Sequence, residues 1–280
     1  MQDSNNNINR FIFRKKVAKD EILTVSNFFY RHTGLSKIKI KDAMKKGAVW
    51  KKTGTGKRKR IRRATAISQS GDLLEIYYDG NLLSYTPPFG KLLKDFHNYS
   101  IWYKPDGLMA QGNNFGDHCS LIRQVEIFFH NRRKVFPVHR LDREASGLMI
   151  LAHSKDAAKK LSRLFQDRKI VKHYNISVLG DFGTEKKKGE IRIPLDGRES
   201  VTEYTVEGYD RVHNTSNVHV IIKTGRKHQI RRHFNLAGYP VIGAPKYGKG
   251  NKNKEGLQLK AVKLEFICPY DNEQKIFTLE

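Results

Sequence analysis

The clearest structural signal in this sequence is a helix enclosed by two apolar strands. Residues 155–166 repeat apolar side chains on one helical face, and Ser154 before them is a typical N-cap residue. The apolar run Met149–Ala152 precedes this helix, and residues 174–178 after it alternate apolar and polar side chains as a half-buried strand does. Further strand patterns follow at hairpin spacing, with a charged hairpin or loop predicted over residues 185–190 and a short helix over residues 227–236. The sequence therefore predicts an α+β fold in which helices flank a mixed, mainly antiparallel sheet.

A chain of 280 residues is long enough for two domains. Two short helical patterns, a strand beginning at Val49 and a turn at Gly71–Asp72 indicate a small N-terminal α/β domain over residues 17–80. A linker over residues 81–95 contains Pro87 and Pro88, and a larger domain is predicted over residues 96–280. The Asn-rich start of the chain predicts a disordered tail over residues 1–16.

The net charge of the chain limits the classes of molecule that it can bind. Its 53 Lys and Arg against 28 Asp and Glu give a net charge of +25 and a pI of about 10.0. Such a field attracts phosphate backbones or anionic membranes. No apolar run approaches the ~20 residues that a membrane span needs, and the N-terminus has no secretory signal. We therefore expect nucleic acid as the partner, no membrane, and a monomer.

The number of cysteines indicates the redox compartment and limits the kinds of metal site. Only Cys119 and Cys268 are present, which argues against a disulfide scaffold and against a thiolate zinc site. We therefore expect a protein of the reducing cytoplasm that uses no metal and no cofactor.

One segment of the predicted N-terminal domain is basic at six of seven positions. It lies between two strands and is predicted to be a solvated, mobile loop. Charge of this density also binds phosphates, with a strong dependence on salt. The predicted phosphate contacts in this loop are Lys57, Arg58, Lys59, Arg60, Arg62 and Arg63.

A second charged cluster surrounds Asp142. His139, Arg140 and Arg143 lie beside this carboxylate on a turn that ends at Gly147, directly before the apolar run. Taken alone, this cluster fits a surface ion-pair turn as well as it fits a catalytic site. Two later segments, residues 172–174 and 224–231, favour the catalytic interpretation because they complete an ordered set of motifs.

Five motifs occur in order along the predicted larger domain. They are Lys104-Pro105-Asp106-Gly107-Leu108; His139-Arg140-Leu141-Asp142 with Ser146-Gly147-Leu148; Lys172-His173-Tyr174; Thr224-Gly225-Arg226-Lys227-His228-Gln229-Ile230-Arg231; and Gly238-Tyr239-Pro240-Val241-Ile242-Gly243. Together they resemble the motifs of the RluA-type pseudouridine synthases, over about residues 98–268. Residues 17–80 resemble, more loosely, the alpha-L RNA-binding module of a ribosomal protein and of several RNA-modifying enzymes.

The resemblance implies an enzyme that isomerises uridine in RNA, detaching the base and reattaching it through carbon 5. Asp142 is then the catalytic carboxylate, which either attacks the anomeric carbon or takes a proton from the ribose. Arg231 is the cation paired with it, since a nearby cation favours an ionised acid. Tyr174 is expected to stack on the uracil and to move the carbon 5 proton, and Ile230 to pack beneath the base.

A uridine inside a duplex cannot be reached, so the nucleotide must flip out at a cost of a few kcal/mol. The resemblance assigns Arg140 to the vacated place, because a planar guanidinium can stack on neighbouring bases. Arg226 and Lys227 are expected to contact phosphates, and His139 to shape the turn beside the substrate.

Each catalytic role has a structural alternative. Asp142 can serve as a turn acid, Tyr174 as a core aromatic residue, and Arg231 as a cation that faces solvent or phosphate. The chain departs from the family pattern at Ala145, Lys227 and Ala244.

Two functions of different classes remain open from sequence. The first is an enzyme that acts on large-subunit ribosomal RNA, with transfer RNA as the second candidate. The other is a non-catalytic RNA-binding or ribosome-assembly factor that keeps the fold. Net charge and the N-terminal domain suit both functions, whereas only the enzyme needs Asp142, Tyr174 and Arg231 together.

Overall fold

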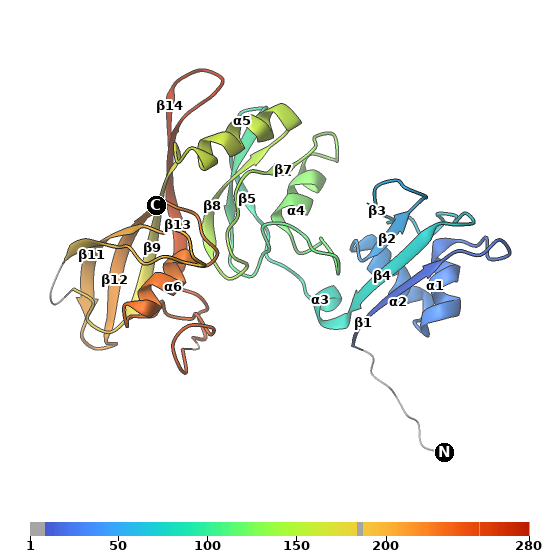
Figure 1. Cartoon of the computed structure of the whole chain (residues 1–280), viewed down its shortest axis with the longest axis horizontal. Coiled ribbons are helices and arrows are strands. Elements are labelled where there is room, and N and C mark those ends of the chain that lie inside the picture. The colour runs from blue at the N-terminus through green and yellow to red at the C-terminus, as the bar shows by residue number, and fades with distance from the viewer. Residues whose placement is uncertain (1–8, 184–186, 252, 280) are drawn as a thin grey trace, which may run out of the picture. The chain divides into compact units, whose positions relative to one another are not determined.

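The computed structural model describes residues 9–183, 187–251 and 253–279, which divide into two compact units. Unit 1 contains the residues up to Pro87 together with Gln111–Gln124. Unit 2 contains Pro88–Ala110 and the residues from Val125 onward, and each unit is built around its own sheet (Figure 1). The segment 111–124 thus belongs to unit 1, although the sequence placed it in the larger domain.

Unit 1 is a four-stranded antiparallel sheet in the order β1-β4-β2-β3, with helices α1 and α2 packed against it. The hydroxyls of Thr24 and Ser36 cap these helices by accepting from backbone N–H groups three residues later. Its elements are β1 (Arg10–Lys16), α1 (Val25–Thr33), α2 (Lys37–Lys45), β2 (Val49–Lys52), β3 (Lys59–Arg60), β4 (Leu73–Asp79) and α3 (Gly80–Ser84).

The predicted disordered tail is wrong for residues 10–16, which form β1. This strand pairs antiparallel with β4, from Arg10 opposite Asp79 to Lys16 opposite Leu73. Its basic residues lie mainly on the solvent face and alternate with Phe11 and Phe13, which pack against the core. The segment is therefore polar in composition but amphipathic as a strand. The prediction for residues 1–8 lies outside the described residues.

The predicted mobile loop is wrong for Lys59–Arg60, which forms β3 and pairs with β2. Three arginines of the segment 57–63 are partly buried. The inward side chains are ion-paired, Arg58 with Glu75, and Arg60 and Arg62 with Asp117. The outward, exposed side chains are Lys57, Lys59 and Arg63.

Unit 2 holds a ten-stranded sheet in the order β10-β11-β12-β9-β13-β8-β6-β5, with β14 beside β13 and β7 beside β8. Among the described strands, only β8 and β13 pair in parallel, so the predicted α+β fold with a mixed, mainly antiparallel sheet is confirmed. The strands are β5 (Lys91–Asp95), β6 (Tyr99–Lys104), β7 (Phe136–Pro137), β8 (Ser146–Ala152), β9 (Val171–Leu179), β10 (Lys188–Ile191), β11 (Thr202–Asp210), β12 (Thr215–Ile222), β13 (Leu259–Ile267) and β14 (Gln274–Thr278).

Two helices of unit 2 flank this sheet, and a third spans the boundary between the units. The helices are α4 (Leu121–Phe128, at the boundary), α5 (Lys155–Gln166) and α6 (Gln229–Leu236). Helix α5 has the predicted bounds, and Ser154 caps it as expected. Helix α6 begins two residues later than predicted, because His228 has a left-handed φ of 52° that a helix cannot include.

Two loop predictions also need correction. The predicted linker over residues 81–95 contains most of α3, which is capped by Asp79, and all of β5, which pairs with β6. The segment 185–190, predicted to be a charged hairpin or loop, overlaps β10, which pairs with β11, while residues 184–186 are not described. No helix within residues 9–183, 187–251 and 253–279 is both long and apolar enough to cross a membrane.

Candidate active site

A cleft of about 780 Å³ lies in unit 2. Loops and strand ends from distant parts of the chain line it: the turn before β8, the end of α5, β9, and the loop that leads into α6. Eight of the predicted site residues line this cleft together: His139, Arg140, Asp142, Tyr174, Arg226, Lys227, Ile230 and Arg231. The six basic residues of the segment 57–63 belong to unit 1 and are not among its lining residues.

Asp142 lies on the turn between β7 and β8, and its side chain is 30% exposed. The backbone C=O of Asp142 accepts from Ala145 N–H, which closes the turn without a side-chain hydroxyl at residue 145. Gly147 follows with a φ of 123°, and a Cβ there would lie 2.3 Å from the Ala261 carbonyl of β13. Only glycine therefore permits the parallel pairing of β8 with β13 that supports this turn.

Arg231 on α6 is the ionic partner of Asp142. Its Nη1 lies 3.1 Å from Asp142 Oδ2 and 3.5 Å from Glu144 Oε2, while its side chain is only 3% exposed. A guanidinium this buried requires countercharges, and the two carboxylates supply them. The arginine therefore fixes the carboxylate of Asp142 at the edge of the cleft.

His228 is a further neighbour of Asp142. It belongs to the motif over residues 224–231, but no role was predicted for it. Its Nε2 lies 3.6 Å from Asp142 Oδ1, and its Nδ1 is 2.8 Å from the Tyr247 hydroxyl. Burial lowers the pKa of His228, although the charge of Asp142 opposes this shift. The left-handed backbone at residue 228 turns the ring into the cleft, and no sequence pattern signalled that conformation.

Tyr174 on β9 is 6% exposed and lines the cleft. Burial, and then the negative charge of Asp142, raise the pKa of the Tyr174 phenol well above its ordinary value. The residue is therefore a neutral phenol at pH 7. It offers an aromatic ring and an O–H donor to a molecule in the cleft, and it is a weak base.

His139 has a structural place in the turn. Its Nε2 accepts a hydrogen bond of 2.9 Å from the Ile150 N–H of β8, and its ring stacks on Phe165 of α5. Burial, with a smaller contribution from the Lys172 charge, lowers the pKa of His139 to about 3. A neutral imidazole that accepts from the backbone anchors the turn to the sheet.

The three remaining predicted cations differ in their exposure and in their hydrogen-bond partners. Arg140 is exposed, and no residue in the described part of the chain forms a hydrogen bond or ion pair with it. Arg226 donates through Nε and Nη2 to the Glu199 carbonyl, at 3.3 Å each. Lys227 is exposed at the cleft.

Gln229 organises the loop that carries Arg226 and Lys227. Its buried side-chain oxygen accepts from the Thr224 hydroxyl and from Arg226 N–H, and its amide nitrogen donates to the Val201 carbonyl and the Thr202 hydroxyl. Thr224 and Gln229 were part of a recognised motif, yet their role is to shape this loop.

Lys104 connects a second motif to the turn of Asp142. Its fully buried ammonium donates to the carbonyls of Pro105, Leu108 and Arg143, at 2.9, 2.8 and 3.3 Å. Burial lowers the pKa of Lys104 to about 8, against the opposing charges of nearby carboxylates. The group is therefore mostly charged at pH 7 and ties the 104–108 turn to the residue that follows Asp142.

Sequence reasoning missed Lys172, which also lines the cleft. It stands two residues before Tyr174 on β9, so both side chains lie on the same face of the sheet. Burial, and then the charge of Arg168, lower the pKa of Lys172 to about 8. The period-two pattern of the strand could have placed it in the site.

Comparisons with known proteins identify the family of the chain. The family model described as RNA pseudouridylate synthase matches residues 98–236. The chain is 33% identical to the dual-specificity RNA pseudouridine synthase RluA of Haemophilus ducreyi, over 71% of this chain and 98% of the relative. It is 36% identical to ribosomal large subunit pseudouridine synthase D of Blochmanniella floridana, over 41% and 38% of the two chains.

A solved structure is similar in fold. Human RNA pseudouridylate synthase domain containing 1 superposes with a TM-score of 0.57 at 21% identity, over 70% of this chain and 86% of the human chain. The ordered motifs, the shared fold and the near-complete coverage of the Haemophilus relative lead to one assignment. The chain belongs to the RNA pseudouridylate synthase family, as an RluA-type RNA pseudouridine synthase.

Proposed function

We propose that Asp142 is the carboxylate that initiates isomerisation of uridine in RNA. The observation that supports this role is the contact of Asp142 with buried Arg231 at the edge of a cleft large enough for a nucleoside. The guanidinium holds one carboxylate oxygen, while the side chain remains 30% exposed toward the cleft. An ionised acid so placed can attack the anomeric carbon or take a proton from the ribose.

The base of the flipped uridine is proposed to lie between Tyr174 and Ile230. Both side chains are buried at the wall of the cleft and offer an aromatic ring and an apolar surface. Because the raised pKa keeps Tyr174 as a neutral phenol, stacking on the uracil is its first role. Transfer of the carbon 5 proton through this residue would require the phenol to release its own proton.

Arg140 is proposed to take the place that the flipped nucleotide leaves. Its guanidinium has no ionic partner within the described residues, so it can move and stack on neighbouring bases without breaking an ion pair. Arg226, Lys227 and Lys172 surround the cleft with positive charge and are proposed to hold the flanking phosphates.

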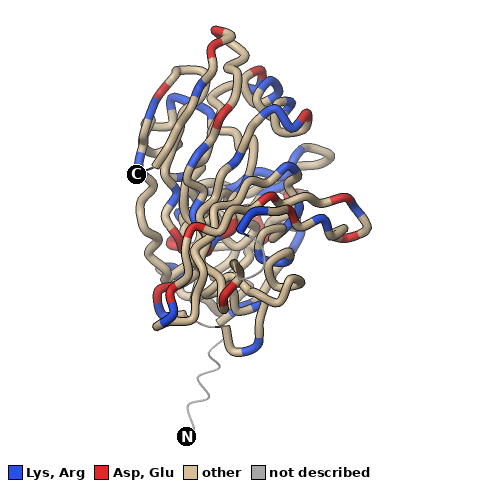
Figure 2. Tube along the Cα trace, turned by 90° about the vertical axis from the view of Figure 1, so that its left-hand side faces the viewer, with Lys and Arg blue, Asp and Glu red and all other residues tan. Residues whose placement is uncertain are grey.

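Large-subunit ribosomal RNA is the proposed substrate class. The Blochmanniella relative is named for the ribosomal large subunit, and the Haemophilus relative is named as dual-specific. Unit 1 is proposed to be an accessory RNA-binding domain, and basic residues recur along the whole trace (Figure 2). Transfer RNA is the second candidate.

Tritium release from RNA labelled at carbon 5 of uridine tests this function. The enzyme is expected to release tritium from large-subunit ribosomal transcripts faster than from transfer RNA transcripts. The reverse order would move the substrate to transfer RNA, and no release from either would favour a binding factor. Mapping pseudouridines in cells that lack the gene would then locate the modified positions.

The basic segment 57–63 gives a prediction that separates binding from folding. Changing the exposed Lys57, Lys59 and Arg63 to Gln is expected to weaken RNA binding and to lower the slope of log affinity against log salt by ~2, at ~0.7 per phosphate contact in single-stranded RNA. The melting temperature should remain near the wild-type value, because these side chains face solvent. Fluorescence anisotropy of labelled ribosomal RNA fragments across salt concentrations measures the slope.

The matched control changes the inward Arg58, Arg60 and Arg62 to Gln. These arginines neutralise Glu75 and Asp117, so their loss is expected to lower the melting temperature of unit 1. An unchanged salt slope after loss of the three exposed cations would remove this segment from the RNA-binding surface.

Lys104 gives a second prediction in the catalytic unit. The change Lys104→Met is expected to cost ~1–3 kcal/mol of stability, because buried carbonyls lose their donor. The turn of Asp142 also loses the hydrogen bond from Lys104 to the Arg143 carbonyl. We therefore expect kcat for tritium release to fall by about tenfold or more. The exposed change Lys159→Met removes the same charge and should alter neither value. Wild-type kcat in Lys104→Met would show that the turn holds its shape without the ammonium.

A further inference from the structure

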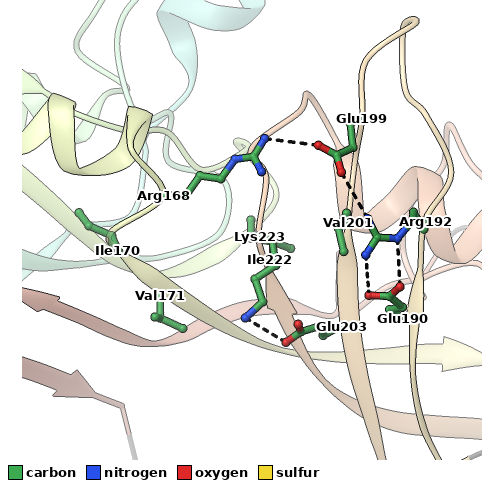
Figure 3. Close-up of a pocket in the computed structure, with 10 residues that line it drawn as sticks. All are labelled: Arg168, Ile170, Val171, Glu190, Arg192, Glu199, Val201, Glu203, Ile222 and Lys223. Atoms are coloured by element: carbon green, nitrogen blue, oxygen red, sulfur yellow. Dashed lines mark hydrogen bonds and ion pairs between the residues drawn. The ribbon is translucent and has the colours of Figure 1, made fainter.

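A second pocket, of about 350 Å³, adjoins the cleft in unit 2. It is lined by residues at the ends of β9 and β12, by β10 and β11, and by the loop that precedes β11 (Figure 3). Arg168, Ile222 and Lys223 line both the pocket and the cleft, so the two hollows are adjacent. A strand whose target nucleotide occupies the cleft can therefore extend into the pocket.

Glu199 lies between two arginines of this pocket. Its carboxylate accepts from Arg192 Nη1 at 3.3 Å and lies 3.6 Å from Arg168 Nη2 (Figure 3). Its backbone carbonyl, and not its carboxylate, accepts twice from Arg226 of the cleft. The two guanidiniums that contact the carboxylate come from separate segments, the turn after α5 and the residue after β10. The position between them suits a compact anion.

The carboxylate of Glu199 is held loosely. The side chains of Glu199, Arg168 and Arg192 are 56%, 54% and 57% exposed, so water screens both contacts. The other two acids of the pocket have their own partners: Glu190 bonds Arg192 through two contacts, and Glu203 pairs with Lys223. When a competing anion displaces Glu199, Glu190 keeps its two contacts with Arg192 and Glu203 keeps its pair with Lys223. Glu199 is therefore the acid of this pocket that an anion can replace.

We propose that this pocket binds a backbone phosphate of the RNA strand that flanks the flipped uridine. The phosphate takes the position of the Glu199 carboxylate between Arg168 and Arg192. Arg168 can bind it with two parallel hydrogen bonds, while Arg192 offers Nη1, because its Nε and Nη2 donate to Glu190. Without RNA, Glu199 occupies the site, so a phosphate that reaches it must displace the carboxylate, which lowers the affinity for the strand. The proposal rests on the proposed function, because the strand is positioned by the nucleotide in the cleft.

A mutant cycle that is measured by RNA binding tests the pocket and does not depend on catalysis. The probe is a fluorescein-labelled ten-residue oligouridylate, and its dissociation constant is measured by anisotropy for the full-length protein. The changes are Glu199→Gln, the pair Arg168→Gln with Arg192→Gln, and all three together. The controls are Glu207→Gln, which removes one carboxylate as Glu199→Gln does, and Arg211→Gln, which removes one guanidinium, both at exposed positions outside the pocket.

Removing the competing carboxylate is expected to tighten binding. Glu199→Gln should lower the dissociation constant by about threefold to fivefold, the range expected for loss of exposed ion pairs. The double arginine change should weaken binding and lower the salt slope by ~0.7 for one phosphate contact. In that background Glu199→Gln should give no further gain, and the two controls should lie near the wild type.

Two results would overturn the proposal. One is a gain from Glu199→Gln that Glu207→Gln reproduces, which would make it an effect of net charge. The other is a gain that persists without Arg168 and Arg192. Tritium release by the wild type is measured in parallel. If the wild type releases none while the cycle behaves as expected, the proposed function fails and the phosphate pocket stands.

Discussion

Replacing Asp142 with Asn is expected to lower the rate of tritium release by about 10³-fold or more. Asn keeps the size and the hydrogen-bonding capacity of the side chain, so it can still accept from Arg231. It cannot act as a nucleophile or as a base toward the ribose. RNA binding should stay near the wild-type value, since the phosphate contacts are made by other residues.

Glu144→Gln is the matched control for this change. Glu144 contacts the same guanidinium at 3.5 Å, but it does not line the cleft. Its loss should therefore reduce activity far less than loss of Asp142. Comparable activity of Asp142→Asn and the wild type, in protein free of endogenous enzyme, would remove Asp142 from the chemistry and return it to the role of a turn acid.

Arg231→Gln is expected to affect both stability and activity. The change removes a guanidinium that is 3% exposed and leaves two carboxylates without their countercharge. Breaking such a pair should cost ~2–4 kcal/mol in unfolding free energy. The rate of tritium release should fall by ~10²–10³-fold, because Asp142 loses its orientation and its electrostatic partner. Urea denaturation in a Trp50→Phe background, where Trp102 reports on unit 2, measures the stability.

The adjacent residue supplies the control. Arg232 follows on the same helix but pairs with the exposed Asp196, so Arg232→Gln should cost no more than ~1 kcal/mol and should retain activity. Equal losses in the two variants would mean that charge on α6 matters in general, and that the contact with Asp142 has no special role.

Local patterns predicted much of the secondary structure. Helix α5 has the predicted bounds because its apolar spacing and its Ser154 cap lie within one short segment. The predictions failed where pairing with a distant strand decided the outcome. β1 pairs with β4, from Arg10 opposite Asp79 to Lys16 opposite Leu73, and its basic residues obscured the two phenylalanines that face the core. β3 failed for the same reason, since a run of cations does not reveal that Arg58 and Arg60 point inward.

The candidate site also contains residues that the sequence predicted and residues that only long-range contacts placed. The ordered motifs identified eight residues that line one cleft, although no periodic pattern placed them together. Sequence reasoning missed His228 because its position depends on a left-handed backbone, and it missed the link from Lys104 to Arg143 because that hydrogen bond joins two loops. Glu199 lay outside every motif.

By itself, the sequence determined the family, the local elements and a charge suited to RNA, because these depend on residue identity and short-range periodicity. The tertiary structure decided how the charges come together, including pairs that no motif indicated, such as Arg58 with Glu75. Asp142 and Arg231 are 89 residues apart, and their contact depends on the order of strands in the sheet and on the parallel pairing of β8 with β13. That order follows from the burial of apolar faces across the whole unit, which no single segment encodes.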